Sequence, residues 1–149
     1  MLAKKVLLTG GAGYIGAHTA TELLQSGYDV VLVDNFSKSD DTLLKGIEKI
    51  LDKKPVFFEG DCKDAQFLKK IFSQNKFDSV IHFAAYKSVS ESVREPLAYY
   101  ENNLGSMIEL LRVMKKFEVN KFIFSSSCAP LRLFFGLLRW LSWPPEACS

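Results

Sequence analysis

The sequence of 149 residues lacks the features that mark several large classes of protein. It has no block of basic residues and a net charge of only +2, which argues against a nucleic-acid-binding surface. It has no apolar run of about 20 residues, the length that a helix needs to cross a bilayer. Lys4 and Lys5 lead directly into a strand, so we expect no signal peptide. These absences together predict a cytoplasmic protein.

Cysteine and histidine are scarce, with three and two residues respectively. Cys62, Cys128 and Cys148 form neither an even disulfide framework nor a metal-binding spacing. His18 and His82 have no acidic or cysteine neighbours at the spacing of metal ligands. No histidine is placed to activate a cysteine nucleophile. We therefore expect neither a metal centre nor thiol catalysis.

Glycine, in contrast, is concentrated directly after a short apolar run. Residues 6–8 are typical of a buried parallel strand, and a helical pattern begins at Tyr14. Glycines recur at a spacing of three, at Gly10, Gly13 and Gly16. Their missing side chains allow a sharp turn and let a pyrophosphate approach the N–H groups at the helix N-terminus. This arrangement predicts a dinucleotide site; a glycine-rich turn without a ligand is the alternative.

Apolar strands alternate with helical patterns along the rest of the chain. Such alternation predicts parallel strands joined by right-handed crossovers, which is an open α/β sheet of the doubly wound Rossmann type. We expect this sheet to be truncated after its fifth strand. The further strands are expected at 29–34, 55–59, 79–84 and 121–124, and the helices at 14–26, 42–51, 65–73 and after Pro96. In the first of these helices Ile15, Thr19, Leu23 and Leu24 stand at helical spacing, and Gly27 is the expected C-cap.

Candidate ligand-binding residues stand where the predicted strands end. Those ends meet at one edge of the sheet, where open α/β sheets bind their ligands. Asp34 ends the second strand about 20 residues after the glycines, where a Rossmann domain places the acid that binds the adenine ribose. A carboxylate there would repel the extra phosphate of NADP, so NAD is the expected cofactor. An ordinary turn residue is the alternative for Asp34.

The composition changes after Ser127. Residues 128–149 contain no Lys and no Asp but both Trp residues, and 131–143 are nearly all apolar. That run is too short to span a bilayer, and an interfacial helix is one interpretation of it. We expect residues 1–127 to form an incomplete NAD-binding domain and 128–149 to be an atypical apolar tail that is not original to it.

Seven segments carry a family resemblance: Thr9-Gly-Gly-Ala-Gly-Tyr-Ile-Gly-Ala-His18, Val33-Asp-Asn35, Glu59-Gly-Asp61, Val80-Ile-His-Phe-Ala-Ala85, Lys87-Ser-Val-Ser-Glu-Ser92, Tyr99-Tyr-Glu-Asn-Asn103 and Phe122-Ile-Phe-Ser-Ser-Ser127. They resemble the first part of the UDP-glucose 4-epimerases, in the extended short-chain dehydrogenase/reductase superfamily. The segment around Lys87 and the strand end at Ser127 favour the epimerases over the related dehydratases and decarboxylases, which are the alternatives.

The resemblance implies a bound NAD that takes a hydride from C4 of a UDP-hexose and returns it to the other face of the 4-keto sugar. It is compatible with a homodimer in the intact enzyme. At the adenosine end it implies Tyr14 and Ile15 on the pyrophosphate, Asp34 and Asn35 on the ribose, and Asp61 and Cys62 beside the adenine. At the nicotinamide end it implies Phe83, Ala84, Ala85, Lys87 and Asn102 or Asn103, with Ser127 as the catalytic serine.

The sequence departs from the family after Ser127. The family continues Ala-Thr-Val-Tyr-Gly, whereas this chain reads Cys128-Ala-Pro-Leu131, and no tyrosine has a lysine four residues later. Because the unperturbed pKa of tyrosine is about 10, a tyrosine base needs that lysine. Two interpretations stay open. The chain is an epimerase fragment whose carboxyl-terminal part is lost or altered, inactive alone, or it is a noncatalytic NAD-binding module whose apolar tail docks on a partner or membrane surface.

Overall fold

The computed structural model describes residues 4–125, and within them five parallel strands form one sheet. Their spatial order is β3-β2-β1-β4-β5, with every neighbouring pair parallel. This is the doubly wound Rossmann-type arrangement that the sequence predicts. The strands are β1 (Lys5–Thr9), β2 (Asp29–Asp34), β3 (Val56–Glu59), β4 (Ser79–His82) and β5 (Phe122–Phe124).

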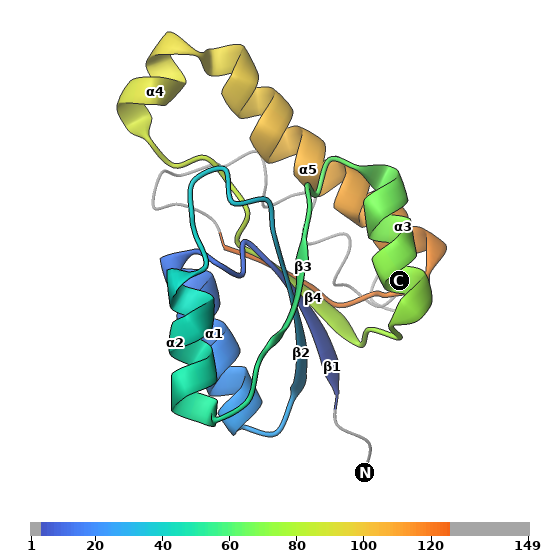
Figure 1. Cartoon of the computed structure of the whole chain (residues 1–149). Helices are drawn as coiled ribbons and strands as arrows, with labels where there is room; N and C mark the ends of the chain where they lie inside the picture. The colour runs from blue at the N-terminus through green and yellow to red at the C-terminus, as the bar shows by residue number, and fades with distance from the viewer. Residues whose placement is uncertain (1–3, 126–149) are drawn as a thin grey trace, which may run out of the picture.

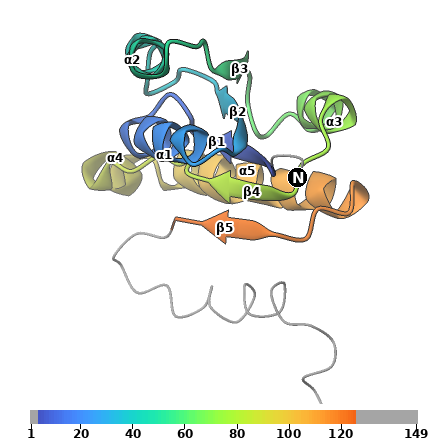
Figure 2. The ribbon, with the colours of Figure 1, turned by 90° about the horizontal axis from the view of Figure 1, so that it is seen from below.

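Helices cover both faces of the sheet (Figure 1). Figure 2 shows the strands from below, in the order β3 to β5, with α1 and α2 on one side and α3 on the other. No helix of residues 4–125 is long and apolar enough to cross a membrane. The helices are α1 (Tyr14–Gln25), α2 (Thr42–Leu51), α3 (Ala65–Gln74), α4 (Val89–Arg94) and α5 (Pro96–Lys116).

Two apolar clusters, one on each face, hold the helices to the sheet. Leu7 of β1 belongs to the cluster with α3 and α5, and its neighbour Leu8 belongs to the cluster with α1 and α2. Both side chains are completely buried. Because successive side chains of a strand point to opposite faces, a strand covered on both sides is a continuous apolar run. This explains why the central strands are the clearest features of the sequence.

The buried face of α1 is lined by small residues near its start. Of the helically spaced residues, Leu23 and Leu24 pack against the apolar cluster on this face, whereas Ile15 is 47% exposed. The fully buried residues of the helix are Gly16, Ala17 and Ala20. The helix starts so close to the glycine turn that a Cβ on Gly16 would collide with the carbonyl oxygen of Gly10. Only small side chains fit in that contact, and Ile15 is turned outward.

The end of α1 follows the sequence signal. Gly27 has a left-handed φ of +83°, and its N–H donates to the Leu24 carbonyl at 3.1 Å, while the Tyr28 N–H donates to the Leu23 carbonyl at 3.0 Å. These two bonds form a Schellman motif, in which glycine adopts the left-handed conformation at little cost. The prediction that Gly27 terminates this helix is confirmed.

Two boundaries were not predicted correctly. β4 ends at His82, two residues before the predicted end, because its partner β1 ends at Thr9 and the chain turns away at Gly10. The segment 89–94 is the helix α4, which is not among the helices expected from the sequence. The Ser88 hydroxyl caps it by accepting from the Glu91 N–H at 3.3 Å. A Ser followed three residues later by Glu is the sequence signature of such a cap.

Candidate functional site

A cavity of about 510 Å³ opens at the carboxyl edge of the sheet, where the strands β1 to β4 end. Its volume lies in the range of cavities that hold small ligands. It brings together nearly every cofactor-binding residue proposed from the sequence. These are Gly10, Gly13, Tyr14, Ile15, Gly16, Asp34, Asn35, Asp61, Cys62, Phe83, Ala84, Ala85, Lys87 and Asn102.

Asn103 lies outside this lining and has a different contact. Its Oδ1 accepts from the Tyr86 N–H at 2.7 Å, and its Nδ2 donates to the Tyr86 carbonyl at 3.1 Å. Asn103 therefore fixes the backbone of the cavity wall from α5. Ser127, proposed as the catalytic serine, and the tail at 128–149 lie outside the described residues.

The glycine turn is packed against the segment that follows β4. Gly10 has a left-handed φ of +72°, and a Cβ at this position would lie 2.7 Å from the backbone nitrogen of Ala84. Backbone meets backbone here, so neither side can yield to an added side chain. Gly10 and Ala84 are therefore held together on the floor of the cavity.

The N-terminus of α1 opens into the cavity without a cap. Its N-cap residue, Gly13, makes no side-chain hydrogen bond, and the first turn contains no acidic residue. The first N–H groups of a helix have no partner within the helix, and the helix dipole adds partial positive charge to them. Because Tyr14 and Ile15 line the cavity, this helix end is a site for an anionic group.

The Asp34 carboxylate holds the loops around it and keeps capacity for a ligand. Its Oδ2 accepts from the Ala12 N–H at 3.1 Å, and its Oδ1 accepts from the Phe36 N–H at 3.0 Å and the Ser39 hydroxyl at 2.9 Å. A carboxylate has about four acceptor sites, so these three bonds leave about one. That site suits a ligand hydroxyl.

The ends of β2 and β3 are joined by side chains. Asn35 donates from Nδ2 to Asp61 at 3.2 Å, and Asp61 also accepts from the Lys63 N–H at 2.8 Å. Beside them, burial raises the pKa of the Cys62 thiol to about 12. Cys62 therefore presents a neutral surface to the cavity, without the thiolate that nucleophilic chemistry requires.

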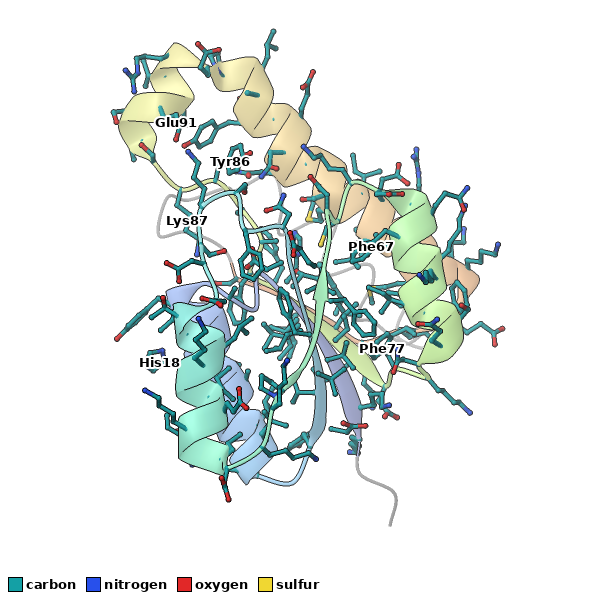
Figure 3. The ribbon with its side chains drawn as sticks, viewed as in Figure 1. His18, Phe67, Phe77, Tyr86, Lys87 and Glu91 are labelled. Carbon is teal, nitrogen blue, oxygen red and sulfur yellow. The ribbon has the colours of Figure 1, made fainter. Side chains whose placement is uncertain are left out.

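On the β4 side, the cavity wall carries charged side chains. Figure 3 shows Tyr86, Lys87 and Glu91 gathered beside α4, whereas Phe67 and Phe77 lie toward α3. Among the described residues, no carboxylate pairs with the Lys87 ammonium. Lys87 is exposed and lines the cavity, so its charge is available to an anion or a hydroxyl of a ligand.

His82 lies beneath this wall and takes no part in the cavity. Its Nδ1 is 2.6 Å from the Thr9 hydroxyl, and its Nε2 is buried without a hydrogen-bond partner. Burial lowers the pKa of His82 to about 4, so the imidazole is neutral near pH 7. In the part of the chain from 4 to 125, no three His, Cys, Asp or Glu side chains are grouped to hold a metal ion.

Several lining residues were missed by sequence reasoning. Most come from the loop after β2 and from α4 and α5, and they reach the cavity only through tertiary packing. The capping signature at Ser88 and Glu91 was the one local signal that would have placed a helix here. The missed residues are Val33, Ser37, Lys38, Ser39, Gly60, Tyr86, Ser88, Glu91, Tyr99 and Ser106.

Comparisons with known proteins agree with this arrangement. A family model described as GDP-mannose 4,6 dehydratase matches residues 7–130. The UDP-glucose 4-epimerase of Yersinia enterocolitica is 52% identical over 122 residues, which are 82% of this chain and 36% of that protein. The UDP-glucose 4-epimerase of Schizosaccharomyces pombe is 50% identical over 122 residues, which are 82% of this chain and 34% of that protein.

Solved structures give the same result. The UDP-glucose 4-epimerase of Bifidobacterium longum, in complex with NAD⁺ and UDP, matches with a TM-score of 0.82 and 49% identity. The match covers 84% of this chain and 37% of that one. The chain thus spans about a third of the length of the curated relatives it matches. The resemblance drawn from the sequence is confirmed: the chain belongs to the GDP-mannose 4,6 dehydratase family and, within its matched residues, is similar to the UDP-glucose 4-epimerases.

Proposed function

We propose that the cavity binds NAD and that this chain is the cofactor-binding part of a UDP-glucose 4-epimerase. One observation carries the proposal: the uncapped N-terminus of α1 and the partly engaged Asp34 carboxylate line the same cavity. The first suits the pyrophosphate of a dinucleotide, and the second suits the hydroxyls of its adenine ribose. The relatives' activity and the bound NAD⁺ of the Bifidobacterium longum epimerase support the same choice.

The remaining wall residues fit the other parts of NAD. Cys62 offers a neutral surface beside Asp61 for the adenine, and Lys87 offers a cation to the nicotinamide ribose. Gly10 supports the fit because a side chain there would displace the floor of the cavity. When bound, NAD supplies the hydride acceptor and donor that inversion at a sugar carbon requires.

The chain itself is proposed to bind the cofactor without turning over a sugar. In the proposal Ser127 contacts the reacting oxygen of a UDP-hexose, but none of the five tyrosines has the partner lysine of the Tyr-x-x-x-Lys pair. General acid–base catalysis and positioning each contribute many-fold to rates, and both would be lost. A noncatalytic NAD-binding module is the second candidate, favoured by the presence of the cavity within residues 4–125.

The test is to titrate the purified chain with NAD and, separately, with NADP. Intrinsic fluorescence or calorimetry measures the affinity for each cofactor. We expect NAD to bind at least about tenfold more tightly, because the Asp34 carboxylate would face the extra phosphate of NADP, and a difference of about 1.4 kcal/mol is tenfold. Asp34→Ala should reduce the difference in affinity between NAD and NADP. The same preparation, given UDP-galactose, should form no UDP-glucose.

Two results would count against the proposal. Equal or tighter binding of NADP would remove the role given to Asp34. Epimerisation by a preparation free of host enzyme would mean that another residue of this chain acts as the base.

A further inference from the structure

Two walls of the cavity that are distant in sequence are joined by one ion pair. Lys38 lies in the loop between β2 and α2, and Glu91 lies on α4. The Lys38 ammonium is 2.9 Å from Oε1 and 3.2 Å from Oε2 of Glu91. Both residues line the cavity, so the pair spans it from the β2 side to the β4 side.

Glu91 is also hydrogen-bonded to α5. The Tyr99 hydroxyl donates to its Oε2 at 2.9 Å and accepts from the Ser88 N–H at 3.1 Å. Tyr99 is only 9% exposed, which makes it a firm anchor. The same anchor fixes Ser88, the residue next to Lys87. Glu91 is thus the point at which the Lys38 loop, α4 and α5 meet.

An aromatic contact strengthens the arrangement. The Lys38 ammonium lies 5.4 Å from the centre of the Tyr86 ring, within the range of a cation–π interaction. The Tyr86 ring packs edge-on against Tyr99 at 5.4 Å. Hydrogen bonding between the partners raises the pKa of Lys38 and lowers the pKa of Glu91, so both are charged near pH 7. Networks of this kind contribute more than isolated surface pairs.

The other salt bridges in the described residues do not cross the cavity. Lys45 and Asp41 are paired at 2.7 Å at the start of α2, and Arg112 and Glu109 are paired within α5. Lys5 pairs with Asp29 at the opposite end of the strands, and Lys63 pairs with its near neighbour Asp61. The Lys45–Asp41 pair is similar in distance to the Lys38–Glu91 pair, is more exposed and lies away from the cavity, so it is the control.

We propose that Glu91 is a positioning residue for the bound dinucleotide. By joining Lys38 to Tyr99 it closes the Lys38 loop and α4 over the cavity, and so slows the release of NAD. This inference rests on the proposed function, because it takes NAD as the ligand. For NAD to leave, the two walls must separate, and the ion pair and the ring contact must break.

The test measures the dissociation rate of NAD by stopped-flow displacement, for Glu91→Gln, Lys38→Met and the double variant. Glu91→Gln keeps the acceptor for Tyr99 and removes only the charge. Each single variant should release NAD about two- to fivefold faster, which corresponds to the energy of an exposed or partly exposed ion pair. The double variant should be no faster than the faster single variant. Lys45→Met, the control, should leave the rate unchanged.

A salt series and a charge exchange separate positioning from general loosening of the fold. Raising NaCl should speed release from the unsubstituted chain and have less effect on Glu91→Gln, because salt screens the pair. Exchanging the partners, as Lys38→Glu with Glu91→Lys, should restore part of the slow release, because it restores the ion pair but not the Tyr99 hydrogen bond or the contact with the Tyr86 ring. The melting temperatures without NAD should be alike for Glu91→Gln and Lys45→Met.

The outcomes that overturn the inference are distinct from those that overturn the proposed function. If the unsubstituted chain binds NAD but Glu91→Gln releases it at the same rate, Glu91 does not close the cavity. Additive effects of the two single variants would also overturn it. If the unsubstituted chain binds no NAD, the proposed function fails, and this inference fails with it.

Discussion

The two sides of the cavity are built by different means. On the β1–β2 side the wall is mostly backbone: Gly10 turns the chain, α1 begins uncapped, and Asp34 accepts from the Ala12 N–H of the glycine turn and the Phe36 N–H of its own loop. On the β4 side the wall is a segment held by side chains of α5, chiefly Tyr99 and Asn103. The first side depends on conformations that few residues can adopt, and the second depends on individual hydrogen bonds.

The largest expected effect that tests this difference between the two sides of the cavity is at Gly10. Gly10→Ala puts a Cβ 2.7 Å from the Ala84 nitrogen at a left-handed φ. We expect it to lower the free energy of unfolding by about 3 kcal/mol, from backbone strain and overpacking. Urea unfolding measures this change. Gly46→Ala in α2 is the matched control: its Cβ meets no atom within 4 Å, and it should stabilise the chain by about 0.5–1 kcal/mol. A loss below 1 kcal/mol for Gly10→Ala would contradict the account of this side.

The β4 side should be sensitive to pH through His82. Its pKa is about 4 in the folded chain and about 6.5 when unfolded, so the unfolded chain binds a proton first as the pH falls. Stability should therefore drop between pH 6.5 and pH 4, by on the order of 3 kcal/mol, and be unaffected by this group above pH 7. Urea unfolding at several pH values measures the drop.

His82→Gln is the reference for that measurement. It removes the titrating group, so its stability should fall less than that of the unsubstituted chain over the same pH range. If the free energy of unfolding fell equally in the two proteins, the pKa of His82 would be the same in the folded and unfolded states. That result would contradict the effect expected from the burial of its ring.

The smallest expected effect is at Asn103. Asn103→Asp removes the donor to the Tyr86 carbonyl and keeps the acceptor for the Tyr86 N–H. The loss of one partly buried hydrogen bond should lower the free energy of unfolding by about 1 kcal/mol. NAD affinity should fall as well, because the segment that carries Lys87 is loosened. Thermal melting and calorimetric titration measure the two effects, and an unchanged affinity would show that the segment holds its position without Asn103.

The sequence predicts the β1–β2 side better than the β4 side because the features of the β1–β2 side are local in the sequence. Glycine spacing, strand ends and Asp34 are local signals, and the strand boundaries there are correct to within one residue. The other side is set by contacts between residues far apart in the chain, such as Lys38 with Glu91. Nothing in the residues around Lys38 indicates that α4 will lie opposite it.

Even on the well-predicted side, helix periodicity does not identify every buried residue of α1: Leu23 and Leu24 pack on the core, but Ile15 does not. The pattern places Ile15 at helical spacing with Leu23, but close packing of the helix on the glycine turn selects small residues instead. Apolar periodicity predicts which side of a helix is buried only where ordinary side chains fill the gap. Apolar periodicity does not predict the buried residues where two backbone segments are in direct contact.

Asp34 accepts hydrogen bonds from the loops around it and, in the proposed function, also selects NAD over NADP. These two roles have a consequence for redesigning the cofactor preference. A variant that accepts NADP must lose the carboxylate, and that loss also frees the Ala12 N–H, the Phe36 N–H and the Ser39 hydroxyl from their acceptor. Cofactor exchange at this position is therefore coupled to loop rigidity. A successful redesign needs at least two substitutions, one to admit the phosphate and one to supply a new acceptor for the loop.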